Sequence, residues 1–131
     1  MSAIDDQGKA ALASATSPRQ AEGCLEQMIA RAGDVICDPF LPLDGLPAEL
    51  ARMAPQAPAL ELVLALASAA DATQAVFGCF GESGQRAQRV WKQAAMIAVE
   101  VHFLSVTGAA HDTAQDMLAH WSRERAGKGG A

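Results

Sequence analysis

The chain has 131 residues, half of them hydrophobic, and its 15 acidic and 10 basic residues give a formal net charge of −5. This length suits a single domain, and the acidic balance opposes nonspecific binding to nucleic acid or to anionic lipid. Three cysteines, Cys24, Cys37 and Cys79, form no C-x-x-C pair, so we expect reduced thiols in the core. The amino terminus MSAIDDQ lacks the basic and apolar regions of a secretory signal, so we expect a cytoplasmic protein.

The amino-terminal quarter predicts a loose segment followed by a helix. Residues 1–16 are small and polar with no sustained period, so we expect them to be disordered or loosely ordered. Ser17 is a suitable N-cap, Pro18 suits the first helical turn and Gly33 is a typical stop signal. These signals predict a helix from about 18 to 32.

Prolines mark the next two elements. The stretch 34–46 contains two prolines and a glycine among apolar residues, which indicates an ordered, nonhelical connection packed on the rest of the domain. Pro47 can begin a short helix, and Pro55 ends it.

The most apolar segment, 57–80, contains no Lys or Arg and only two acidic residues, Glu61 and Asp71. Its Ala and Leu content favours a helix enclosed on several sides. A second mostly apolar helix is predicted at about 85–106, and the glycines of the turn at 81–84 should fold the two helices antiparallel. The length of the first helix permits a membrane span, but the central Asp71 and the lack of cationic flanks argue against one.

A last helix is predicted at about 109–125, with 126–131 as a flexible tail. The sequence therefore predicts an all-α, single-domain bundle of four or five helices over 17–125. Its centre is the antiparallel pair formed by 57–80 and 85–106.

No motif for catalysis, for a cofactor or for a metal is present. His102, His111 and His120 are nine residues apart, a step that turns a helix by about 180° and does not form a cluster. Asp112, Asp116 and His120 fall on one helical line, which would suit a divalent ion but is more typical of a solvated face. We therefore expect no catalytic residue, no cofactor and no metal site.

Glu61 and His102 are the most interesting polar pair. Folding the two long helices about the glycine turn places these side chains at similar depth, where they could form a buried pair that fixes the helix register. The alternative is that both side chains reach solvent at the rim of the bundle.

A basic stripe follows the glycine turn. Three cationic residues lie at three-residue steps on the predicted 85–106 helix, a pattern found more often on a solvated face or at an acidic-partner contact than in a DNA reader. Together with nearby apolar residues, they form a predicted interaction surface, which consists of Phe40, Leu41, Arg86, Arg89, Trp91 and Lys92.

The leading functional hypothesis is a nonenzymatic protein–protein interaction module. A small bacterial adaptor, chaperone or assembly subunit that binds another protein or itself would have this composition. The alternative is a small-molecule- or metal-binding bundle with a pocket near Glu61 and His102. A third, less favoured hypothesis is a DNA-binding helical protein, and we expect no membrane partner.

Overall fold

The computed structural model describes residues 18–129, with side chains from 23 to 127. This part of the chain contains five helices and no strand, which confirms the predicted all-α bundle. The helices are α2 (Pro18–Cys37), α3 (Leu46–Met53), α4 (Ala59–Phe77), α5 (Glu82–Val106) and α6 (Ala114–Gly129). The expectation for residues 1–16 lies outside the described residues.

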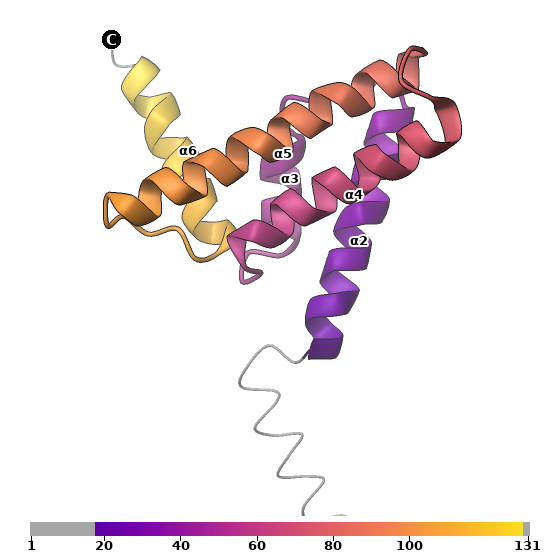
Figure 1. The fold of residues 1–131 in the computed structure, drawn as a ribbon. Coiled ribbons are helices and arrows are strands. Elements are labelled where there is room, and N and C mark those ends of the chain that lie inside the picture. The colour runs from indigo at the N-terminus through magenta and orange to yellow at the C-terminus, as the bar shows by residue number, and fades with distance from the viewer. Residues whose placement is uncertain (1–17, 130–131) are drawn as a thin grey trace, which may run out of the picture.

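Helices α4 and α5 form a two-helix antiparallel layer, as predicted, and α2, α3 and α6 lie on one side of it (Figure 1). Both α4 and α5 carry a row of buried apolar residues on the side that faces α2, α3 and α6, and we call each row the seam of its helix. On α4 this seam includes Leu62 and Leu66, and on α5 it includes Val90 and Ile97. Burial of these side chains is the main favourable term for the bundle.

Helix α2 is longer than predicted, because it continues through Gly33 to Cys37. Gly33 has no positive φ, so nothing at this residue turns the chain out of the helix. Val35 and Ile36 are buried and extend the apolar stripe of Met28 and Ala32 by one turn. The tertiary contacts of that last turn outweigh the modest helix penalty of one glycine, about 1 kcal/mol.

The amino-terminal ends of α4 and α6 are joined through the backbone. The Ala59 amide donates to the Asp112 carbonyl at 2.8 Å, and the Ala114 amide donates to the Ala57 carbonyl at 2.8 Å. Asp116 caps α6, since its carboxylate accepts the amides of Asp112 and Thr113 at 3.0 and 3.1 Å. These bonds satisfy donors that a helix start leaves unpaired, and they fix where α6 begins relative to α4.

The cysteines differ from the expectation of core thiols. Cys37 and Cys79 are exposed, and Cys24 is half-buried. The reason is position, since Cys37 is the last residue of α2 and Cys79 lies in the turn after α4. All three are free thiols.

By length and composition α4 would be able to cross a membrane, and it is the one helix of the described residues with this property. A third of its most apolar window is buried inside the bundle. A core helix of a bundle has the same composition, so this finding is weak evidence for a span.

Candidate functional surfaces

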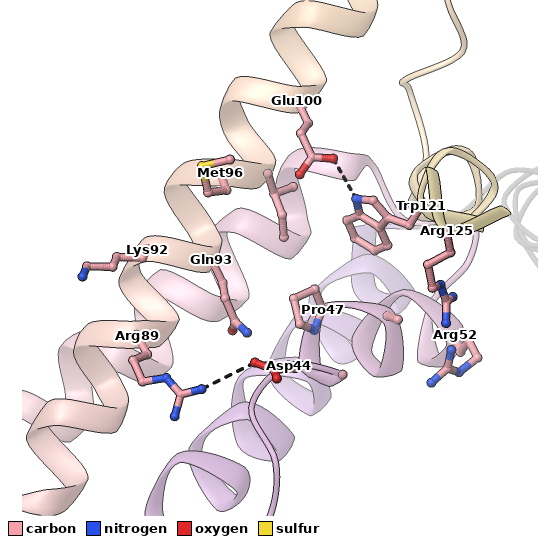
Figure 2. Close-up of a pocket in the computed structure, with 13 residues that line it drawn as sticks. Asp44, Pro47, Arg52, Arg89, Lys92, Gln93, Met96, Glu100, Trp121 and Arg125 are labelled. Atoms are coloured by element: carbon pink, nitrogen blue, oxygen red, sulfur yellow. Dashed lines mark hydrogen bonds and ion pairs between the residues drawn. The ribbon is translucent and has the colours of Figure 1, made fainter. Parts of the chain in front are cut away.

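A groove of about 540 Å³ lies where α3, α5 and α6 meet the 38–45 connection, and we call it the basic groove. Figure 2 shows its lining side chains. Four are cationic, namely Arg52, Arg89, Lys92 and Arg125, and two are acidic, namely Asp44 and Glu100. The local charge is therefore positive on a chain whose net charge is −5, so the groove would favour an anionic ligand.

Most of the cationic charge in the basic groove is not neutralised by ion pairs. Arg89 approaches Asp44 at 3.4 Å, but both side chains are exposed, and such pairs contribute little to stability. Among the described residues, no ion pair involves Arg52, Lys92 or Arg125. These three side chains are free to meet an incoming anion.

The wall of the groove also contains the side-chain amide of Gln93, whose oxygen accepts no hydrogen bond. The Gln93 side-chain amide donates to the Leu43 carbonyl at 2.7 Å. Its Oε1 atom is buried and has no hydrogen-bond partner. An unpaired buried acceptor is costly, and because this atom is shielded from solvent it is not a contact point for a ligand in the groove.

Glu100 stands at the α6 end of the same groove and takes part in a cluster of polar side chains. The Trp121 indole donates to Glu100 Oε2 at 2.8 Å, as drawn in Figure 2. His120 Nε2 lies 3.4 Å from this oxygen and 3.3 Å from Glu124 Oε1. This cluster was missed in the sequence because Glu100 reads as a solvated residue and its partners lie on another helix.

The six residues of the predicted interaction surface do not lie together in the structure. Arg89 and Lys92 line the basic groove, whereas Phe40 is 92% exposed in the 38–45 connection. Leu41 is partly buried against the core. The Trp91 indole donates to the Gln74 side chain at 3.0 Å, so Trp91 contacts α4.

Arg86, the sixth residue of that surface, has a structural role. Its guanidinium donates to the carbonyls of Val35, Ile36 and Leu41 at 2.8, 2.9 and 2.6 Å. Carbonyls at the end of a helix lack intrahelical partners, and a cation is favourable there. Arg86 therefore joins α5 to the carboxyl-terminal end of α2, and three of its five N–H donors are used in these bonds.

Glu61 and His102 do not form a pair. His102 is exposed, and no ion pair joins it to Glu61 among the described residues. Glu61 is half-buried, and its Oε2 atom is buried without a hydrogen-bond partner. A second hollow, of about 390 Å³, is lined by His102, His111 and Asp112, and Glu61 is not part of its lining.

Apolar residues gather on the side of α4 and α5 that faces away from the rest of the bundle. Steps of about 100° per residue place them opposite the buried seam of each helix, and α2, α3 and α6 leave this side open (Figure 1). We call this surface the outer face, and it consists of Leu60 (57% exposed), Leu64 (49%), Val99 (62%), Phe103 (61%) and Val106 (70%). The signal was present in the sequence, since 99, 103 and 106 follow helical spacing on the side opposite the core seam.

Comparison with protein-family models, with curated proteins and with solved structures finds no match for this chain.

Proposed function

We propose that this protein is a protein–protein interaction module that associates with a second copy of itself through the outer face. The observation that carries this proposal is the exposure of five large apolar side chains on one side of the α4–α5 layer. Soluble monomers seldom expose large contiguous apolar patches, and such patches mark interaction sites.

The pattern on α5 suits a helical partner. Val99, Phe103 and Val106 are separated by four and then three residues, the spacing with which one helix packs along another. Between them the outward side of α5 carries His102 and otherwise uncharged residues. Two copies would therefore bring the apolar rows of α5 together without opposing like charges in those rows, whereas α4 carries the exposed Asp71 on the same outward side as Leu64.

The expected affinity is modest. Each of the five side chains is about half exposed, so complete burial adds roughly 1 kcal/mol per residue, or on the order of 10 kcal/mol for the five side chains of each of the two copies. Association itself costs about 4–15 kcal/mol, which offsets much or all of this gain. We therefore expect self-association that depends on protein concentration rather than a permanent dimer.

Sedimentation velocity over a concentration series tests this proposal. The wild-type mass should rise with concentration, and Val99→Glu should remain a monomer throughout. Val76→Glu is the matched control because Val76 is also exposed (75%), yet it lies about 120° around α4 from Leu64. A wild-type protein that stays monomeric, or a Val99→Glu variant that associates as strongly as wild type, would refute the proposal.

A second candidate function is small-molecule binding in the basic groove. Among the described residues, three cations of the groove have no ion-pair partner, and they favour an anionic ligand. Native mass spectrometry of freshly purified protein tests this candidate. A retained small molecule that is lost from an Arg52→Ala, Arg125→Ala double variant would support it, and release of nothing by either protein would count against it.

A further inference from the structure

We infer that Glu100, His120 and Glu124 form a binding site for a divalent transition-metal ion of the zinc class. One ligand atom from each residue lies within 4.8 Å of the other two. His120 and Glu124 are one turn apart on α6, and Glu100 reaches them from α5. This inference is independent of the proposed self-association, because the outer face contains none of these residues.

The separations between the ligand atoms match those around a bound ion. Zinc binds imidazole nitrogen and carboxylate oxygen at about 2.0–2.2 Å, so two ligands of a tetrahedral ion lie about 3.3 Å apart. His120 Nε2 lies 3.4 Å from Glu100 Oε2 and 3.3 Å from Glu124 Oε1. A direct charge-assisted hydrogen bond would be shorter, at about 2.7–2.9 Å. Each carboxylate oxygen is therefore spaced from the imidazole nitrogen as two ligands of one ion are, and all three ligand atoms lie within 4.8 Å of one another.

A neighbouring side chain orients the first ligand. The Trp121 indole donates to the same Glu100 oxygen that faces His120, at 2.8 Å. A carboxylate oxygen has two lone pairs, so this bond leaves one for the ion. Hydrogen bonds to ligands commonly hold them in position at metal sites.

The site is enclosed on one side and open to solvent on the other. The side chain of His120 is 15% exposed and that of Glu100 is 24% exposed, whereas Glu124 is 52% exposed. Three protein ligands leave a fourth position, and the solvent side at Glu124 gives water access to it.

The donor set selects the class of ion. One imidazole nitrogen and two carboxylate oxygens suit zinc and its neighbours among the divalent transition metals. Calcium and magnesium require about six oxygen ligands, which this cluster does not supply. The two carboxylates also neutralise the charge of a divalent ion.

Isothermal titration with Zn²⁺ tests the site, with the visible spectrum of added Co²⁺ as an independent report on coordination. The protein should be the full chain without a histidine tag. Cys37 and Cys79 should be replaced by Ser, because exposed thiols bind zinc themselves. We expect one ion per chain and a tetrahedral Co²⁺ spectrum.

His120→Gln and Glu124→Gln should each weaken Zn²⁺ binding at least about tenfold, the loss seen when even a supporting partner of a metal ligand is removed. Glu124 is exposed near the end of α6, so its replacement leaves the fold intact. His111→Gln is the matched control, because His111 Nε2 lies 3.4 Å from Asp112 but has a single carboxylate partner. It should bind Zn²⁺ as wild type does.

Two results would overturn the inference. The first is that the wild-type protein binds no Zn²⁺, in which case the cluster is only a histidine between two acids. The second is that His120→Gln and Glu124→Gln bind Zn²⁺ no more weakly than His111→Gln does, because the ion would then be held elsewhere on the surface.

Discussion

Gly84 lies near the start of α5, against the backbone of the turn that follows α4. Its replacement by Ala tests how closely α5 and this turn approach each other. A Cβ atom at Gly84 would overlap the carbonyl oxygen of Gly78 and lie 2.9 Å from the carbonyl carbon of Cys79. These are backbone atoms and have no rotamer by which to move away. Gly78 itself has a φ of 77°, so this part of the turn already depends on a glycine conformation.

We expect Gly84→Ala to lower the free energy of unfolding by about 1–2 kcal/mol. Overpacking of a tight site costs about 1–3 kcal/mol, and the better helix propensity of Ala returns roughly 0.5–1 kcal/mol. The matched control is Gly33→Ala in the middle of α2, where an added Cβ has no atom within 4 Å and φ is not positive. There only the propensity gain applies, so the same substitution should stabilise the protein by about 0.5–1 kcal/mol.

Urea unfolding followed by far-ultraviolet circular dichroism measures both changes. All variants should be compared at one protein concentration, because self-association adds to the apparent stability. The midpoint should fall for Gly84→Ala and rise for Gly33→Ala, with similar slopes. If Gly84→Ala raises the midpoint as Gly33→Ala does, the close contact at the turn does not limit packing and the reasoning fails.

Two further predictions each compare two side chains on one helix that have different surroundings in the structure. Arg86→Ala should lower the free energy of unfolding by about 2–3 kcal/mol, because three carbonyls lose a charged donor. Lys92→Ala on the same helix should change the free energy of unfolding by less than about 0.5 kcal/mol. Equal effects in chemical denaturation would contradict the carbonyl-binding role of Arg86. Leu66→Ala should cost about 2–5 kcal/mol since Leu66 is fully buried, whereas Leu64→Ala, on the outer face, should cost less than about 1 kcal/mol. Thermal unfolding should rank the two leucine variants in this order.

The sequence was sufficient to predict the existence of the helices and the central pair, because long apolar periods and glycine turns are local signals. The bounds of the last helix were wrong, since α6 begins at Ala114 instead of about 109 and continues to Gly129, into the predicted tail. The end of α2 was not predictable from Gly33, since the residues that extend the helix, Val35 and Ile36, gain their stability from packing. The pairing of α4 with α6 through backbone bonds at Ala57 and Ala59 was also hidden. Backbone atoms carry no sequence signal for such contacts.

The candidate sites were less accessible from the sequence than the fold. Arg86 belongs to a regular basic stripe, and only the position of α2 shows that its guanidinium binds helix-end carbonyls. His120 was aligned with Asp116, but Asp116 caps α6 and His120 faces Glu100 instead. Spacing along one helix identifies residues on one side of it, whereas a site that joins two helices depends on how those helices cross.

Helix α5 explains why this small bundle should have an interaction surface at all. It has two apolar sides, one buried seam that includes Val90 and Ile97, and one exposed row of Val99, Phe103 and Val106. A helix that is apolar on both sides is typical of a position between two layers, yet the described residues supply a layer on one side only (Figure 1). A second copy packed on the outer face would give α5 the missing layer, and a single Glu at Val99 is the smallest change that should prevent it.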